Sequence, residues 1–232
     1  MTTQTHSSPV SATSGQAKPC LADRVTKSLL GYGVLAGVVF EASIITQGLT
    51  RHGFRIAHDD ASLLANGPLG WIQIVTFLVA GAMTAAAAVG VGRALAGQPG
   101  GKWGPRLIGL YGAGLMAAGP FYADPADGFG PGAPLGKATR ISWHGAGHLV
   151  SASIGFIALI AACFVIARYF SRAGRRGMAV YSRITGVVFL AGFLGVTTGS
   201  SSSAIVLPFY AAVLAAFTWL AIVAVGLYRR TA

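Results

Sequence analysis

Six long apolar stretches constrain this chain more than any other feature of its sequence. They cover residues 28–49, 69–91, 107–122, 144–167, 184–199 and 204–228. A helix needs about 20 apolar residues to cross the hydrocarbon core of a bilayer. Charged residues make up only 10% of the chain, whereas soluble domains carry about 25%. The sequence therefore predicts an all-α, polytopic membrane protein, a bundle of six transmembrane helices. It excludes an ordinary soluble enzyme, a disordered protein and a coiled coil.

A polar segment precedes the first apolar stretch. Residues 1–27 are rich in Ser and Thr near their start and lack an apolar core, so we expect a disordered cytoplasmic tail. The first apolar run begins too late and runs too long for a signal peptide. Residues 28–230 then form one transmembrane domain, which leaves no room for a separate soluble domain.

The basic residues are distributed unevenly about these stretches. The chain carries 17 Lys and Arg against 6 Asp and Glu. On one side of the predicted membrane lie only Arg51, Arg55, Lys137 and Arg140. The positive-inside rule therefore places both termini in the cytoplasm. We expect the protein in the inner or plasma membrane of the cell. We expect membrane lipids as partners, and no nucleic acid, because no basic stripe with interleaved aromatic residues occurs.

Small residues recur one helical turn apart within the apolar stretches. Examples are Gly33 with Gly37 and Gly195 with Gly199. Such pairs let helix backbones approach closely in lipid. They indicate close packing within the bundle or, alternatively, a face for a homo-oligomer.

Acidic and histidine side chains gather on the predicted outer side. Charge bias for topology explains where Lys and Arg lie, but it does not explain the position of His. The outer loops at 50–68 and 123–143 and the start of the fourth span carry most of these groups: His52, His58, Asp59, Asp60, Asp124, Asp127, His144 and His148. This one-sided cluster is the strongest indication of a functional site.

The most specific local pattern is SWHGAGH at residues 142–148. His144 and His148 are four residues apart and share one helix face, a spacing that suits two imidazoles on one metal. Ser142 or Thr139 is placed to cap the helix, whose positive end keeps the rings neutral. Gly145 stands where a zincin has its Glu, so that mechanism is excluded. The structural alternative is two interfacial histidines that bond to loop carbonyls.

The preceding loop supplies carboxylates. Asp124-Pro125 opens a turn-rich segment of glycines and prolines that cannot be helical. Folded back, the loop brings Asp124 or Asp127 toward His144. Asp124, His144 and His148 would then form a three-ligand site for Zn²⁺, or the carboxylate would orient a histidine base without metal. The alternative is an Asp-Pro turn and a helix cap.

Two further groups are candidates for function. Glu41 lies about 10 Å inside the first span at 1.5 Å per residue, and an intramembrane acid is costly unless it serves a purpose. It is either an acid/base group or a structural hydrogen-bonding group. His58, Asp59 and Asp60, with Asp127 and Ser142, are candidates for contact with substrate. The adjacent acids could instead be solvated or cap a helix.

At these residues the chain resembles the DUF998 family of prokaryotic membrane proteins. The resemblance rests on the DP…GFGPGAP loop, on SWHG with a histidine four residues later, and on the span that follows. It implies a six-helix integral membrane protein with Asp124, His144 and His148 as the motif positions. The family has no assigned activity, so the resemblance implies no substrate.

Together these patterns predict a membrane-embedded, hydrolase-like enzyme with an outward-facing site for a lipid or another amphipathic substrate. Its catalytic groups would be Glu41, Asp124, His144 and His148, with or without Zn²⁺. The alternative is a transporter, channel or accessory membrane factor without enzymatic activity. A continuous polar track to the cytoplasmic face would favour that alternative, but the inner halves of the spans are mostly apolar.

Overall fold

The computed structural model describes residues 20–138 and 140–231, and this part of the chain is helical without strands. The helices are α1 (Leu21–Thr50), the 3-10 helix η1 (Ala61–Ala65), α2 (Gly70–Ala94), α3 (Trp103–Ala118), α4 (Trp143–Arg172), α5 (Arg176–Thr197) and α6 (Ser203–Tyr228). Of the six α-helices, all but α3 are long and apolar enough to cross a membrane. Most of the predicted tail lies outside the described residues, and residues 21–27 extend α1.

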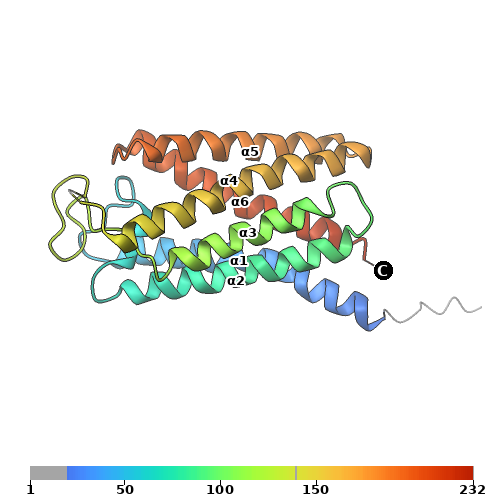
Figure 1. The fold of residues 1–232 in the computed structure, drawn as a ribbon, viewed down its shortest axis with the longest axis horizontal. Helices are drawn as coiled ribbons and strands as arrows, with labels where there is room; N and C mark the ends of the chain where they lie inside the picture. The colour runs from blue at the N-terminus through green and yellow to red at the C-terminus, as the bar shows by residue number, and fades with distance from the viewer. Residues whose placement is uncertain (1–19, 139, 232) are drawn as a thin grey trace, which may run out of the picture.

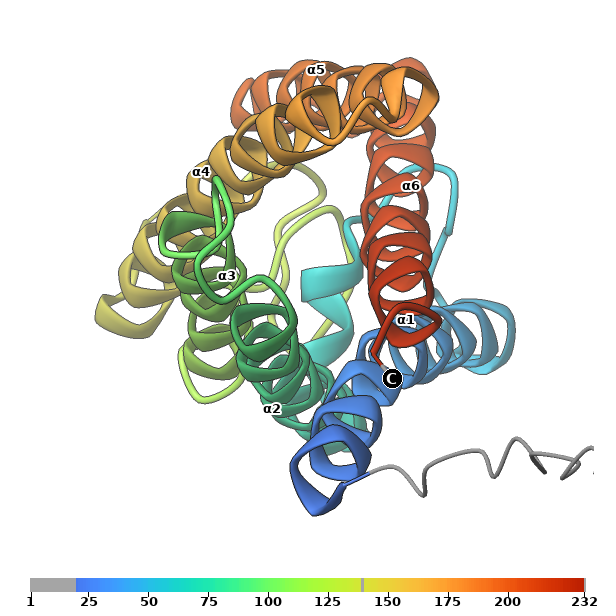
Figure 2. The same cartoon turned by 90° about the vertical axis from the view of Figure 1, so that its right-hand side faces the viewer.

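The six α-helices form a closed ring. Each packs on its neighbours in sequence, and α6 packs on α1 as well as on α5 (Figure 2). The helices run side by side along the long axis of the molecule (Figure 1). One end of the ring, here called the loop end, carries residues 51–69, 119–138, 140–142 and 198–202. The opposite terminus end carries the start of α1, the end of α6 and residues 95–102 and 173–175.

Glycines set the closest contacts in the ring. A Cβ on Gly81 of α2 would lie 2.6 Å from the Gly112 carbonyl oxygen of α3, and a Cβ on Gly114 would lie 2.9 Å from the Gly155 Cα of α4. Backbones approach this closely only where no side chain intervenes. These glycines therefore hold α3 between α2 and α4.

The predicted glycine pair of the first span also packs within the chain. A Cβ on Gly33 would lie 2.9 Å from the Ala224 Cβ, and a Cβ on Gly37 would lie 3.0 Å from the Phe217 Cβ. Both neighbours belong to α6. This pair joins α1 to α6 inside one chain, and the homo-oligomer face stays a prediction.

The third helix begins and ends earlier than the apolar pattern predicts. The expected span covered residues 107–122, whereas α3 is Trp103–Ala118. Pro120 has no backbone N–H to continue the helical hydrogen bonds. Residues 119–122 consequently belong to the loop end, where they contact the candidate site.

Large side chains fill the ring toward the terminus end. Trp219 is fully buried, and its Nε1 donates to Ser182 Oγ at 2.9 Å. Phe170, Ile166 and Ile108 are also buried. A close-packed interior of this kind leaves few voids, so the space inside the ring is found toward the loop end.

Candidate functional site

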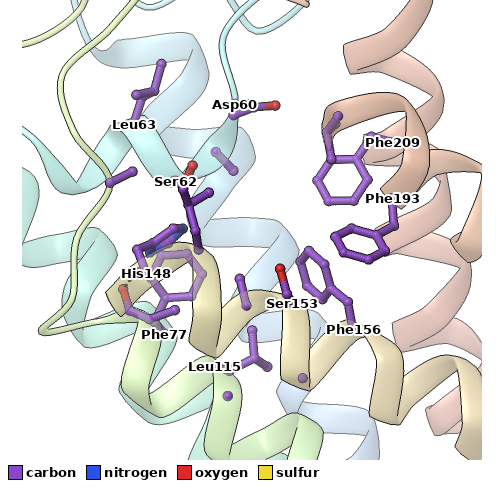
Figure 3. A pocket seen from close by; sticks show the side chains of 18 of the residues that line it. Asp60, Ser62, Leu63, Phe77, Leu115, His148, Ser153, Phe156, Phe193 and Phe209 are labelled. Carbon is purple, nitrogen blue, oxygen red and sulfur yellow. Dashed lines mark hydrogen bonds between the residues drawn. The ribbon is translucent and has the colours of Figure 1, made fainter. Parts of the chain in front are cut away.

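A cavity of about 310 Å³ lies inside the ring at the loop end. All six α-helices and η1 contribute to its wall. Most of the wall is aromatic or aliphatic, as Figure 3 shows for Phe77, Leu115, Phe156, Phe193 and Phe209. Phe156 touches Phe193 and Phe209 through tilted or edge-on ring contacts. The wall can therefore bury an apolar chain.

Polar groups line the same cavity near the loop end. They include Asp60 at the start of η1, Ser62 within η1, Asp124 from the loop after α3, His148 and Ser153 of α4, and Tyr210 of α6. Figure 3 shows Asp60, Ser62 and His148 apart from the aromatic group formed by Phe156, Phe193 and Phe209. Few polar groups in a mainly apolar pocket are typical of sites that orient a ligand.

Three loops cover this end of the ring and are bonded to one another. Arg55 Nη2 donates to the Asp127 carbonyl at 3.0 Å, and Asn66 Nδ2 donates to the Ala123 carbonyl at 3.1 Å. Lys137 Nζ donates to the Thr198 carbonyl at 2.6 Å. These contacts connect segments 51–69, 119–138, 140–142 and 198–202 into one cover, which we call the loop cover.

Three of the predicted substrate-contacting residues serve this cover. His58 Nδ1 lies 2.9 Å from the Ser201 carbonyl oxygen. The Asp59 carboxylate is fully buried and pairs with Arg55 at 2.7 Å. Asp127 has a left-handed backbone with φ 53° and accepts from Arg55 through its carbonyl. None of the three lines the cavity, so the geometry gives them no direct contact with a ligand there.

Asp60 is different because its side chain lines the cavity. Its buried Oδ1 has no hydrogen-bond partner among the described residues. Burial, followed by the charges of Asp127 and Asp59, raises the pKa of Asp60 to about 6. The carboxyl group can therefore hold a proton near neutral pH.

Asp124, Ser142 and His144 form a hydrogen-bonded cap at the start of α4. The Ser142 backbone N–H donates to Asp124 Oδ2 at 2.9 Å, and Ser142 Oγ donates to Asp124 Oδ1 at 2.5 Å. Ser142 Oγ accepts from the Gly145 N–H at 3.0 Å and lies 2.9 Å from His144 Nδ1. The predicted Ser142 cap is confirmed, and Asp124 belongs to it.

The absence of a side chain at Gly145 makes room for this cap. A Cβ there would overlap Asp124 Oδ2. His144 stacks on Tyr122 with ring centres 4.2 Å apart, and its Nδ1 lies 3.8 Å from Asp124 Oδ1. Asp124 and His144 are thus brought together, but by contacts that position the loop and helix.

His148 reaches the cavity from the next turn of α4. Its Nδ1 lies 2.8 Å from the Phe121 carbonyl oxygen and 3.2 Å from that of Ala118. Carbonyl oxygens only accept, so in the neutral ring Nδ1 carries the proton and Nε2 keeps its lone pair. His148 is 7% exposed. Its ring is therefore held in one tautomer at the cavity wall.

The residues predicted to bind Zn²⁺ do not form a ligand cluster. Within residues 20–138 and 140–231, no three His, Cys, Asp or Glu side chains are placed to hold a metal ion. Both oxygens of Asp124 bond to Ser142, and His148 Nδ1 faces carbonyls. In this arrangement these side chains make other hydrogen bonds, and the Zn²⁺ site stays a prediction.

Glu41 is not among the residues that line this cavity. It lines a second hollow between α1 and α6, and its Oε1 has no hydrogen-bond partner in the described part of the chain. The structure therefore separates Glu41 from Asp124, His144 and His148. A structural role for Glu41 would require a hydrogen bond from its carboxyl group to another helix. Oε1 makes no such bond among the described residues.

The aromatic wall is the part of the site that the sequence did not reveal. Phe156, Phe193 and Phe209 belong to three different helices. Each is an ordinary apolar residue within its own stretch, and only the closed ring brings the three together. The sequence carried no signal that would have selected them.

Comparison with known proteins identifies one family. The sequence pattern of a family described as "Protein of unknown function (DUF998)" matches residues 34–226. No curated protein and no solved structure matches the chain.

Proposed function

Because this chain belongs to the DUF998 family, whose description assigns no activity, we propose its function from the loop-end cavity. We propose that the cavity binds the apolar chain of a lipid or another amphipathic molecule. The protein then hydrolyses an ester bond near the polar end of that molecule. The observation that carries this proposal is one cavity lined by aromatic rings and by His148 and Asp60.

Binding is supported by the size and lining of the cavity. Its volume of about 310 Å³ falls at the lower end of the range for small-molecule sites, about 300–1,000 Å³. Each buried methylene of an acyl chain contributes about 0.8 kcal/mol. Several methylenes against Phe156, Phe193 and Phe209 therefore give useful affinity without any charged contact.

The chemistry follows from the two ionisable groups. His148 Nε2 accepts a proton from water, and the resulting hydroxide attacks the ester carbonyl carbon. Protonated Asp60 gives its proton to the leaving alkoxide oxygen as the C–O bond breaks. The products are a carboxylic acid and an alcohol, and the proton on His148 returns to Asp60 through solvent. The Phe121 carbonyl fixes the base by accepting from Nδ1.

One observation favours a second function, a lipid-binding accessory factor without catalysis. Asp124 and His144, two of the four predicted catalytic groups, are engaged in the cap at the start of α4. Of these four groups, His148 then remains free for chemistry at the cavity, where Asp60 is a second ionisable group. A channel is not favoured, because Trp219 and Phe170 fill the ring toward the terminus end.

A chain-length series of chromogenic acyl esters distinguishes the two functions. Hydrolysis by the purified protein should rise with acyl length, since the longer chain fills the aromatic wall. His148→Gln should lower kcat about 100-fold or more, the usual contribution of a general base. His52→Gln, at an exposed residue of the first loop, is the matched control and should retain activity.

Equal turnover by His148→Gln and the unmodified protein would contradict the catalytic role. Saturable binding of the same esters without turnover would instead support the accessory function. Absence of both binding and turnover in the unmodified protein and in both variants would reject the cavity as a lipid site.

The arrangement in the membrane forms part of the proposal. We propose that α3 crosses the bilayer with the other five helices and that both termini lie in the cytoplasm, in the plasma membrane. Support comes from the place of α3 in the ring between α2 and α4. The few basic residues of the loop end also support this orientation. The cavity would then face the outside of the cell.

A further inference from the structure

A second hollow lies on the outer surface of the ring, apart from the loop-end cavity. It is a groove of about 550 Å³ between α1 and α6. Its walls are Val34 and Val38 of α1 and, on α6, Leu214, Ile222 and Val225. Of these, Val38 is 60% exposed and Leu214 is 52% exposed. The groove therefore faces the bilayer and not the interior of the ring.

Cationic groups surround the terminus end of this groove. Arg175 reaches it from the α4–α5 turn, and its Nη1 would lie 3.7 Å from a Cβ built on Gly226. The Arg175 guanidinium also lies 5.2 Å from the centre of the Phe170 ring. Arg229, at the end of α6, lines the same groove. Neither arginine forms an ion pair with an acidic side chain in the described residues.

A third cation lies on the adjoining part of α1. Lys27 Nζ is 5.6 Å from the centre of the Tyr228 ring on α6. Lys27 precedes Val34 by two helical turns, so both lie on the same face of α1. The groove thus begins among cations at the terminus end and continues as an apolar channel along the two helices.

We propose that this groove binds one phospholipid with an anionic headgroup, drawn from the leaflet at the terminus end. The phosphate contacts Arg175 and Arg229, and one acyl chain lies between α1 and α6. Guanidinium groups match phosphate oxygens with paired hydrogen bonds. Arg175 is already held against Phe170 and Gly226, so less side-chain freedom is lost when the phosphate binds.

The dimensions and polarity of the groove fit such a ligand. From Leu214 to Arg229 the helix rises about 22 Å at 1.5 Å per residue. This exceeds half of a hydrocarbon core of about 30 Å, so a complete acyl chain of one leaflet fits. Glu41 lines the groove far from the arginines. An acid there disfavours an anionic headgroup, which fixes the lipid with its phosphate at the arginine end.

Native mass spectrometry of the full chain tests this proposal. The probes are phosphatidylglycerol and phosphatidylcholine with identical acyl chains. The unmodified protein should retain one phosphatidylglycerol about 30-fold more strongly than phosphatidylcholine, given about 1 kcal/mol for each of the two arginines near an anionic lipid. The double variant Arg175→Gln/Arg229→Gln should lose this preference.

Two further variants separate the groove from general surface charge. Arg176→Gln/Arg183→Gln removes the same charge from the same end without altering a groove residue, and should keep the preference. Ala221→Phe narrows the groove and should reduce retention of both lipids. Melting temperatures of all variants check folding.

The proposal is overturned if Arg175→Gln/Arg229→Gln keeps the preference, or if the control pair lowers it equally. Retention of both lipids by Ala221→Phe at the level of the unmodified protein would also overturn it. Competition for the arginines by an acidic peptide, with no effect of acyl chains on binding, would assign the site to a protein partner instead.

Discussion

Asp60 and Asp124 are carboxyl groups at the same end of the ring, but their surroundings give them different roles. Asp124 accepts two hydrogen bonds from Ser142 and belongs to a helix cap. Asp60 lines the cavity, and its buried Oδ1 has no partner among the described residues. The sequence could place both acids near His144 and His148. It could not predict which of the two carboxylates hydrogen-bonds within a helix cap, because that depends on the fold of the loop.

The raised pKa of Asp60 predicts a pH-dependent stability. Burial and the charges of Asp127 and Asp59 raise this pKa from 3.8 to about 6. The folded protein therefore holds the Asp60 proton more tightly than the unfolded chain. The stability that comes from protonated Asp60 is fully present below about pH 4. It is lost as the pH rises through about 6, because the buried carboxyl group must then ionise.

Asp60→Asn removes this cost. Near pH 8 the variant should melt at least about 2–4 °C above the unmodified protein. For a protein of this size, about 1 kcal/mol of added stability raises the melting temperature by that amount. The gain should shrink near pH 4, where Asp60 is neutral in both states. Thermal melts of the detergent-solubilised protein at both pH values measure the effect, and a gain that is independent of pH would contradict it.

Gly145 tests the cap directly. Gly145→Ala places a Cβ against Asp124 Oδ2, so we expect a loss of about 1–3 kcal/mol from overpacking. Gly177→Ala is the matched control, since Gly177 is also in the first turn of a helix and a Cβ there meets nothing within 4 Å. Chemical denaturation of both variants compares them. Equal stability would show that the cap tolerates a side chain at Gly145.

At the scale of helices, the apolar pattern predicted each of the six elements but not their ends or their neighbours. The third span was predicted four residues too late, because hydropathy continues through Gly119 while Pro120 stops the helical bonds. The glycine pairs indicated close packing. Which glycine meets which helix, as with Gly114 against Gly155, depends on helix order in space, which hydropathy does not encode.

The α3–α4 contact gives a prediction at this scale. A Cβ on Gly114 would lie 2.8 Å from the Ser151 carbonyl oxygen, whereas one on Gly109 of the same helix would lie 3.7 Å from the Ala88 Cβ. Gly114→Ala should therefore destabilise the protein by about 1–3 kcal/mol. Gly109→Ala should change stability little or raise it. Comparable losses in both variants, measured by thermal melts, would contradict this view of the ring.

At the scale of the whole molecule, closure of α6 on α1 creates both proposed sites. It encloses the loop-end cavity and forms the groove on the outer surface. The sequence pattern placed acids and histidines at one membrane face, and Asp60, Asp124 and His148 do line one cavity at the loop end. It also grouped Glu41 with them. Depth along one helix cannot show that Glu41 lines the hollow between α1 and α6.

The proposed orientation is tested with single cysteines in a Cys20→Ser/Cys163→Ala background. Leu135→Cys, at the loop end, should react with a membrane-impermeant maleimide in intact cells. Gln98→Cys, in an exposed turn at the terminus end, should react only after the membrane is opened. The opposite pattern would invert the topology, and labelling of both in intact cells would contradict an odd number of crossings between them.

The central claim is that the cavity at the loop end holds an apolar chain, and covalent capture measures this most directly. A lipid with a photoreactive diazirine in its acyl chain is illuminated with the full-length protein, and the modified residues are identified by peptide mass spectrometry. We expect adducts on Phe156, Phe193 or Phe209 that an excess of unlabelled lipid abolishes. Adducts confined to bilayer-facing residues such as Leu78 and Val187, unaffected by competitor, would contradict it.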